Sequence, residues 1–364
     1  MSSWGRVNLG SVCQFRYGKS LPAKARSGSS FPVVGSGGVV GYHDQALLNG
    51  PGIVVGRKGS IGSVTWLDDP YWPIDTAYYI ETDPALIDLR YLFHALKSLP
   101  LKSMNKSAAI PGLNRDDAYR LEITLPPLDE QRRIANLLDG ADRLRKQYQE
   151  KRELANAAIH VAFSSHFSSA KHYRSFREVA KLTGGSTPSK GNPVFWDGGT
   201  IPWFSTKDLK KAVLSDSIDH LTEAAISSTS LRKNDRATVA LSIRGMSLAH
   251  RLPMSVIPAG STVNQDIKII HSELPYSPLL WFAIFKYREP KLLSTVATSA
   301  HGTKRIETSH ILDLDIPIWE GRSLSTIEGL MSQQASLMEN FDHLLQYSSE
   351  LYASLATRAF AGEL

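Results

Sequence analysis

The sequence predicts an α+β protein in which two similar globular domains are separated by two long helices packed as an antiparallel coiled coil. Two segments carry apolar residues mostly every three or four positions over roughly 40 residues each. Each of them follows a stretch in which short β-branched runs alternate with glycine-rich turns. Because the same motifs recur in the same order in both halves, we expect an internal repeat with pseudo-two-fold symmetry.

Residues 1–125 are predicted to form the first domain. Valine and isoleucine lie between glycines at 31–41 and 52–56, which predicts strands joined by turns that need a permissive backbone. A helix is predicted over 88–97, where the apolar residues fall on one face.

The first long helix is predicted over residues 126–168. Pro126 and Pro127 favour an extended entry, and Asp129 is expected to cap the helix, with Glu130 in its first turn. Only a narrow face of this helix is apolar, so it needs a partner along its whole length.

The second half of the sequence repeats this plan. Residues 169–316 are predicted to form the second domain, with strands at 239–243 and 267–270 and a helix over 278–286. The second long helix is predicted over 317–364, and its apolar spacing resembles that of the first. Two such stripes would bury each other as a coiled coil. A pair of bundle or crossover helices inside a globular core is the alternative.

Four motif matches support the repeat. No single match is persuasive, but four in one order are hard to assign to chance. They pair residues 12–22 with 179–188, 54–59 with 239–245, 75–80 with 266–270, and 112–126 with 302–317.

Composition restricts the class of protein. The chain has 364 residues, a formal net charge of +6 and one cysteine, Cys13, which excludes an internal disulfide and a cysteine-based metal cluster. The basic excess is consistent with nucleic-acid binding without establishing it. We expect a cytoplasmic protein, because the sequence has neither a signal segment nor an apolar run of bilayer length.

Catalytic and cofactor motifs are missing from the sequence. Gly18-Lys19-Ser20 resembles the end of a phosphate-binding loop, but Cys13 occupies the position that requires glycine. We find no dinucleotide-binding Gly-x-Gly-x-x-Gly turn, Gly-x-Ser-x-Gly elbow or His-Glu-x-x-His motif. We therefore expect no catalytic site, no metal and no cofactor in this chain.

Short basic clusters beside glycine and serine are the candidates for DNA readout, because phosphates and base edges need donors on loops. Arg57 with Lys58 leads in the first domain and Arg244 in the second, while a solvated turn is the alternative for each residue taken singly. The DNA-binding candidates are Lys19, Arg57, Lys58, Ser60, Asn114, Arg115, Ser186, Thr187, Lys190, Ser242, Arg244, Ser247, Lys304 and Arg305.

Three features together resemble the specificity (S) subunit of type I restriction-modification enzymes. They are the phrase LPPLDEQRRIA at 125–135, the ending AFAGEL at 359–364, and the duplicated plan of globule plus long helix. The resemblance covers essentially the whole chain, and the phrase directly precedes the first long helix.

The resemblance implies that each globule is a target recognition domain reading one half of a bipartite, asymmetric sequence in double-stranded DNA. The two helices would be the spacer between half-sites. The S subunit would be non-catalytic and would recruit two methyltransferase (M) subunits, which methylate adenine, and through them the restriction (R) subunits. S-adenosylmethionine, ATP and Mg²⁺ would belong to those partners.

The resemblance also implies a contact with the M subunits at Glu130, Gln131, Arg132 and Arg133, for which a solvated charged face is the alternative. The second helix lacks the Glu-Gln-x-x-Ile phrase, which puts the symmetry of assembly in doubt.

Alternative functions stay open at this point. A DNA-recognition subunit of a methylation-only system would look the same from this chain. A coiled-coil scaffold without DNA binding, or an autonomous nuclease or methyltransferase, would belong to a different class.

Overall fold

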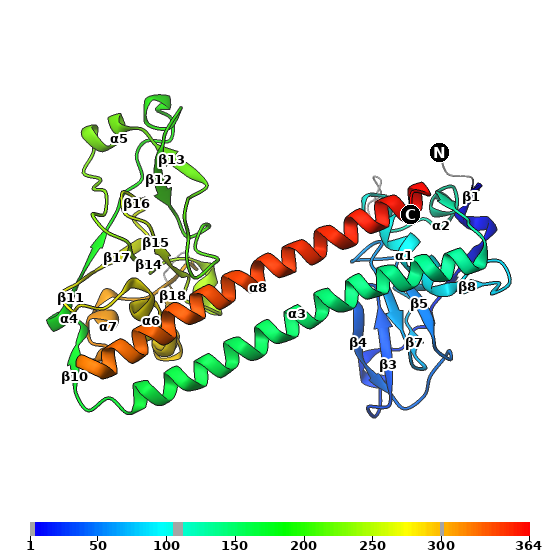
Figure 1. The fold of residues 1–364 in the computed structure, drawn as a ribbon, viewed down its shortest axis with the longest axis horizontal. Coiled ribbons are helices and arrows are strands. Elements are labelled where there is room, and N and C mark those ends of the chain that lie inside the picture. Colours follow the sequence, from blue (N-terminus) through cyan, green and yellow to red (C-terminus); the bar gives the residue numbers. More distant parts are fainter. Residues whose placement is uncertain (1–3, 105–111, 299–301) are drawn as a thin grey trace. The chain divides into compact units, whose positions relative to one another are not determined.

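Both apolar stripes form continuous helices in the computed structural model, α3 (Leu128–Ser168) and α8 (Gly321–Ala361) (Figure 1). The structure describes residues 4–104, 112–298 and 302–364. Contacts divide the chain into unit 1, Met1–Glu150 with Asp342–Leu364, and unit 2, Lys151–Phe341. Each unit therefore contains one part of each long helix together with one mixed domain, which confirms the predicted α+β class.

In the described part of unit 1, a four-stranded antiparallel sheet in the order β2-β8-β5-β6 lies beside a three-stranded sheet in the order β4-β3-β7, and β1 pairs with β9. The strands are β1 (Arg6–Asn8), β2 (Cys13–Tyr17), β3 (Phe31–Gly35), β4 (Gly38–His43), β5 (Gly52–Gly56), β6 (Val64–Leu67), β7 (Trp72–Pro73), β8 (Ala77–Thr82) and β9 (Glu122–Thr124). The short helices are α1 (Leu89–Ser98) and α2 (Arg115–Tyr119).

The described part of unit 2 repeats this topology, with sheets in the orders β11-β17-β14-β15 and β13-β12-β16, the pair β10-β20, and an additional pair β18-β19. The strands are β10 (Tyr173–Ser175), β11 (Ala180–Gly184), β12 (Ile201–Phe204), β13 (Asp219–Leu221), β14 (Thr238–Ser242), β15 (Met254–Ile257), β16 (Thr262–Val263), β17 (Ile267–Ser272), β18 (Ala297–Thr298), β19 (Lys304–Arg305) and β20 (Asp315–Pro317). The helices are α4 (Phe176–Val179), α5 (Glu223–Ser228), α6 (Pro278–Leu293) and α7 (Thr308–Leu312).

Strand register identifies the equivalent residues of the two units. Tyr17 pairs with Tyr78 where Gly184 pairs with Lys268. The match of residues 12–22 with 179–188 agrees with this register. So does the strand part of the last match, because β9 pairs with β1 as β20 pairs with β10.

Two predicted matches are wrong in register. Gly56 pairs with Ala77 where Ser242 pairs with Ile267, so Thr76, and not Asp75, corresponds to Asp266. A one-residue shift reverses which side chains face the core, and both Ala77 and Ile267 are buried.

The loop match at residue 112 is also displaced. The amide of Leu113 donates to the carbonyl of Arg57, as that of Ile306 does to Ile243. Gly112 therefore corresponds to Arg305, and Asn114-Arg115 to Glu307-Thr308. In the same register Lys58, and not Arg57, corresponds to Arg244.

The helix predicted over 88–97 is confirmed as α1. The Asp88 side chain caps it by accepting from the amides of Arg90 and Tyr91, which satisfies two of the unpaired N–H groups of its first turn. Helix α6 begins at Pro278 as expected, but it continues to Leu293, beyond the predicted 286.

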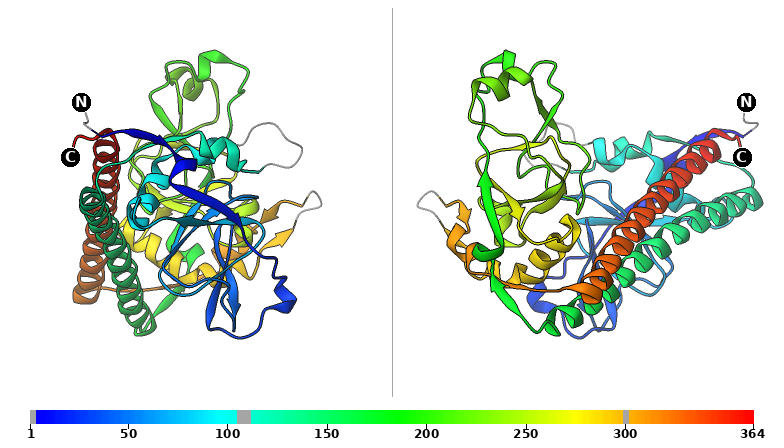
Figure 2. Two further views of the ribbon diagram at one scale, coloured as in Figure 1. Left: turned by 90° about the vertical axis from the view of Figure 1, so that its right-hand side faces the viewer. Right: turned by 60° about the vertical axis from the view of Figure 1, so that its left-hand side comes forward.

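In unit 1 the two long helices run antiparallel. Tyr352 of α8 and Asp139 of α3 both bind His94, and nearer the chain end the carbonyl of Phe360 accepts from Thr124, which precedes α3. In Figure 2 the red end of α8 lies alongside the start of α3. Ile134 and Leu138 of α3 share one core with Ala359 of α8.

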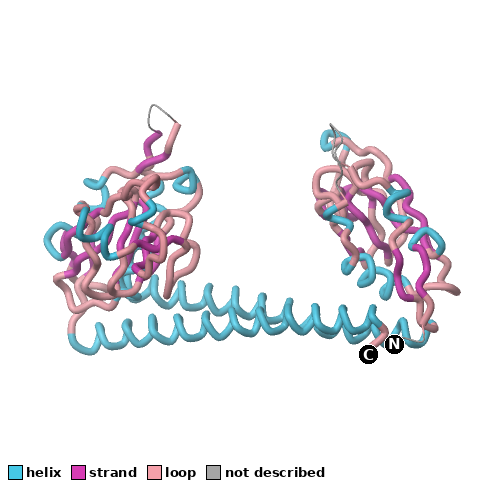
Figure 3. The backbone as a smooth tube through the Cα atoms, turned by 90° about the horizontal axis from the view of Figure 1, so that it is seen from above, coloured by secondary structure: helices cyan, strands magenta, loops and turns pink. Residues whose placement is uncertain are grey.

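Unit 2 shows the same antiparallel arrangement. Trp319 contacts Phe163 and Phe167 near the end of α3, and Gln334 binds Asn156 further back along it. Figure 3 shows the two helices side by side in each unit. The buried seam is narrower than the predicted stripe, because Leu137, Leu337, Leu344 and Leu351 stay more than one-third exposed.

The long helices start slightly later than their predicted first residues, 126 and 317. In α3 the first helical bond runs from the Gln131 amide to Pro127, so Asp129 lies inside the first turn and is not the cap. In the second case Asp315–Pro317 is held as β20 against β10, so α8 begins at Gly321; it ends at Ala361. No helix among the described residues is both long and apolar enough to cross a bilayer.

Candidate nucleic-acid interface

The loop from Arg57 to Ser63, between β5 and β6, carries the first candidates in unit 1. The amides of Arg57 and Lys58 both donate to the carbonyl of Thr76, at 3.0 and 3.1 Å, which turns the chain sharply after β5. Gly59 follows with φ of 80°, a conformation that disfavours side chains. The bond from Leu113 to Arg57 then brings the second predicted loop, with Asn114 and Arg115, against the first.

Arg57 and Arg115 gather around an exposed tyrosine. The guanidinium carbon of Arg57 lies 4.9 Å from the ring centroid of Tyr17 and 6.0 Å from that of Tyr78, and Arg115 lies 5.6 Å from Tyr17. Contacts of this kind between a guanidinium and an aromatic face are attractive. We call Tyr17, Arg57, Tyr78 and Arg115 the Tyr17 cluster. Its two arginines were predicted from the sequence as DNA contacts, and its two tyrosines were not.

The environment keeps the cluster positively charged. Burial raises the pKa of Tyr78 to about 12, although the charges of Arg57 and Arg115 oppose this, so the phenol stays neutral at physiological pH. Its hydroxyl donates to the carbonyl of Leu113 at 3.1 Å. Arg115 has an ion pair with Asp116 at 3.7 Å.

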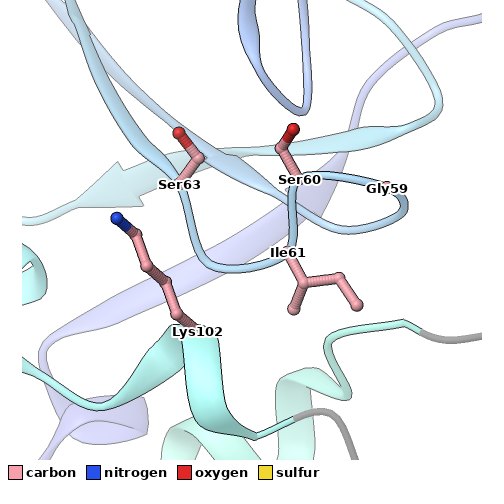
Figure 4. A pocket seen from close by; sticks show the side chains of 5 residues that line it. All are labelled: Gly59, Ser60, Ile61, Ser63 and Lys102. Carbon is pink, nitrogen blue, oxygen red and sulfur yellow. The ribbon is translucent and has the colours of Figure 1, made fainter. Parts of the chain in front are cut away.

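A shallow hollow of about 380 Å³ adjoins the same loop, lined by Gly59, Ser60, Ile61, Ser63 and Lys102 (Figure 4). The ammonium group of Lys102 points toward Ser63, and the hydroxyl of Ser60 lies at the same side of the hollow. Lys102 is exposed, and nothing in its sequence context indicates this position, since the contact joins residues about 40 apart in the chain. The hollow therefore adds one cation to the predicted set.

Other predicted residues of unit 1 lie on the surface with local roles. Lys19 is exposed and stands 5.8 Å from the Trp72 ring, whose indole nitrogen donates to the Lys19 carbonyl. The Asn114 side chain accepts from the amide of Asp116 and so caps α2. Lys58 is exposed and has no ion pair with any described residue.

In unit 2 the predicted cations Arg244 and Arg305 have acidic neighbours, as Arg115 does in unit 1. Arg244 lies 3.9 Å from a carboxylate oxygen of Asp266, and Arg305 pairs with Glu307. Backbone bridging aligns Arg244 with Arg305, and the ammonium of Lys304 donates to Thr298. The structure therefore brings three predicted cations together at one edge.

The two serine candidates near Arg244 are not fully exposed. Ser242 is fully buried, and its hydroxyl binds Thr206 and the carbonyl of Arg244, so its assignment as a DNA contact is wrong. Ser247 is half-buried in the same loop.

The loop after β11 holds the remaining candidates. Ser186 accepts the indole proton of Trp203 on its carbonyl, and Thr187 donates to Gln265. Lys190 is exposed.

The predicted subunit-contact residues divide into two kinds. Gln131 is buried, and its side chain accepts from the Asp88 amide at 2.7 Å and donates to the carbonyls of Leu86 and Pro126, so it fixes α1 to the start of α3 instead of facing a partner.

Glu130, Arg132 and Arg133 are at the surface. Arg133 forms two hydrogen bonds with Glu130, which lower the pKa of that carboxyl, and Arg132 pairs with Asp129.

Helix α8 lacks the Glu-Gln-x-x-Ile phrase, but it binds the cap residue of α6 as Gln131 binds the cap residue of α1. Glu328 of α8 accepts from the amide of Ser277 at 2.7 Å, and Ser277 caps α6 as Asp88 caps α1. Glu328 therefore takes the structural place of Gln131, which reduces the asymmetry expected from the sequence.

Comparison with known proteins shows similarity to one family over part of this chain. Residues 1–155 match the family model of the type I restriction modification DNA specificity domain. The EcoR124I/EcoR124II specificity subunit of Escherichia coli is 28% identical over 149 residues, 40% of this chain and 36% of that protein. The resemblance to type I specificity subunits is confirmed.

Other specificity subunits match over similar lengths. The MjaVIII specificity subunit of Methanocaldococcus jannaschii is 31% identical over 126 residues, 33% of this chain and 27% of that protein. This chain thus spans about one-third of the length of the curated specificity subunits it matches.

Solved structures match over nearly the whole chain. The type I system S subunit from M. genitalium has a TM-score of 0.64 at 14% identity, covering 99% of this chain and 96% of that one. A chain from a study of type I system assembly and conformational transition has a TM-score of 0.56 at 15% identity, covering 99% and 98%. At these identities the likeness to specificity subunits concerns the fold. Among the described residues, no group of three or more His, Cys, Asp or Glu side chains could hold a metal ion.

Proposed function

We propose that this chain is a DNA-sequence-specificity subunit, in which the domain of each unit reads one half of a bipartite, asymmetric target. The observation that carries the proposal is the repeat: two sheets of one topology each present cations on the equivalent loop, at Lys58 and Arg244. Loops of this kind suit phosphates and base edges. The match of residues 1–155 to a DNA specificity domain points in the same direction.

The same proposal gives this chain no catalytic step of its own. It binds the target and recruits two M subunits that methylate adenine, and R subunits join through the M complex, all in the cytoplasm. S-adenosylmethionine, ATP and Mg²⁺ belong to those partners. Glu130, Arg132 and Arg133 are the surface residues through which the start of α3 contacts M.

Single-molecule sequencing of adenine methylation tests this function. Cells expressing this chain with its cognate M subunits should carry a methylated bipartite motif with a fixed gap, and cells expressing the M subunits alone should lack it. Absence of such a motif in both, with no salt-dependent DNA binding by the purified complex, would instead favour a coiled-coil scaffold. Methylation without restriction of unmodified DNA would identify a methylation-only system.

A further inference from the structure

The Tyr17 cluster holds Arg57 in place without neutralising it. Arg57 forms no ion pair with a described carboxylate, and residues 105–111, outside the described part, contain no Asp or Glu. The Nε atom of Arg57 is buried and has no hydrogen-bond partner among the described residues. The guanidinium of Arg57 is thus held by its contacts with two rings and by the burial of Nε, while no described carboxylate neutralises its charge.

Ring contact also fixes the orientation of the guanidinium. A guanidinium that lies against an aromatic face keeps its N–H groups at its edges, where they can bind a partner. Tyr17 is 52% exposed, so this contact lies at the surface of unit 1 and not in its core. Ordering the side chain before binding reduces the rotamer entropy that a DNA contact would cost.

We propose that Arg57 reads one guanine in the half-site bound by unit 1, that Tyr17 is its positioning residue, and that Arg115 binds a neighbouring phosphate. The proposal rests on the DNA-reading function proposed above. Guanine is the base whose O6 and N7 acceptors match the two parallel N–H donors of a guanidinium in the major groove. Lysine offers charge without this fork, so it cannot replace arginine at such a contact.

Unit 2 lacks an equivalent of the Tyr17 cluster. The positions equivalent to Tyr17, Arg57, Tyr78 and Arg115 hold Gly184, Ile243, Lys268 and Thr308. The consequences of changing Arg57 should therefore appear in one half-site alone.

The experiment selects DNA from a randomised duplex library with the full chain in complex with its M subunits. Arg57→Lys should reduce the preference for guanine at one position by about 5- to 150-fold, with other positions unchanged. Tyr17→Ala should reduce the same preference by a smaller factor, and Tyr17→Phe should restore it. Arg115→Gln should weaken binding to all sequences alike and lower the salt slope by about one.

Arg16→Gln is the matched control, because Arg16 neighbours Tyr17 on β2 but pairs with Glu81. It should leave the base preference unchanged. Equal weakening of all sequences by Arg57→Lys would make Arg57 a phosphate contact and overturn the proposal, and so would an unchanged preference. If the unaltered complex selected no sequence, the proposed function itself would fail, before any variant was compared.

Discussion

Units 1 and 2 share a sheet topology and differ in surface chemistry. Trp72 of β7 and Trp203 of β12 illustrate the relation: they lie on non-equivalent strands, yet each donates its indole proton to the carbonyl at equivalent positions, Lys19 and Ser186. Both carbonyls follow glycines, Gly18 and Gly185, where a Cβ atom would lie within 2.5 Å of a backbone oxygen. The shared backbone is thus maintained by close approaches that different side chains can satisfy.

The loops differ in the groups that surround their cations. In unit 1 Arg57 lies against tyrosines and no described carboxylate pairs with it. In unit 2 Arg244 lies near Asp266, and Arg305 pairs with Glu307. A repeat of this kind can change what each unit binds while its sheets stay the same.

The largest expected difference lies in the cores, at the equivalent positions Phe15 and Leu182. Phe15 is fully buried, with Tyr78 and Tyr119 rings at 5.6 Å, whereas Leu182 is only partly buried. Phe15→Ala should destabilise unit 1 by about 3–5 kcal/mol, and Leu182→Ala should cost unit 2 less than about 2 kcal/mol. Denaturant unfolding followed by hydrogen exchange would assign each loss to its unit. Equal losses would contradict the difference in packing.

An intermediate effect is expected from acid at His94 of unit 1. His94 is fully buried, and because the Asp139 carboxylate can only accept, Nε2 donates to it and Nδ1 accepts from the hydroxyl of Tyr352, at 2.7 and 2.9 Å. Burial lowers the pKa of His94 despite the opposing effect of Asp139. The equivalent position, counted from the caps of α1 and α6, is Ala283 in unit 2.

The unfolded chain therefore binds a proton at His94 that the folded unit resists. The free energy of unfolding of unit 1 should fall as pH drops below the usual histidine value of about 6.5, and should level off below the lowered pKa. His94→Gln should remove this pH dependence and cost about 1–3 kcal/mol near neutral pH. Thermal unfolding of the unaltered chain and of the His94→Gln variant, at values from about pH 7.5 to about pH 5, measures this difference. An identical pH dependence in the variant would count against this account.

The smallest effect is expected at Asp266. Asp266→Asn removes the carboxylate beside Arg244 and gives unit 2 an unpaired cation, as in unit 1. The pair is long and partly exposed, so the free energy of unfolding should change by less than about 1 kcal/mol. DNA affinity of the complex should rise modestly, as titrations at several salt concentrations would measure. Glu81→Gln, the same loss of charge beside Arg16, is the control; an equal gain there would show a general charge effect.

The sequence was sufficient to predict the two long helices, α1 and the order of the repeated elements. Long apolar periodicity predicted α3 and α8, and the apolar face over residues 88–97 predicted α1. The sequence was insufficient to align the two units at the ends of their loops, where insertions shift the register and no periodic pattern marks the shift. For that reason Gly112 was matched with Gly302, although it corresponds to Arg305.

Side-chain environment was the other weakness. A serine or glutamine at a strand or helix end looks like a surface residue, yet both Ser242 and Gln131 are buried. The Ser242 hydroxyl binds the Arg244 carbonyl and the Thr206 hydroxyl, and the Gln131 side chain binds the Asp88 amide and the Pro126 carbonyl. Tyr17 and Lys102 were not predicted as part of the site, because only the fold places them beside the Arg57 loop.

The division of the chain into units has a consequence for synthesis on the ribosome. Unit 2 is one continuous segment, Lys151–Phe341, whereas the core of unit 1 includes Ala356 and Ala359 from the last stretch of the chain. Domains generally fold as units in the order in which their residues emerge. Unit 2 can thus finish folding while the core of unit 1 still lacks its final helix. Unit 1 can accordingly complete its fold only after the ribosome has translated the whole of unit 2.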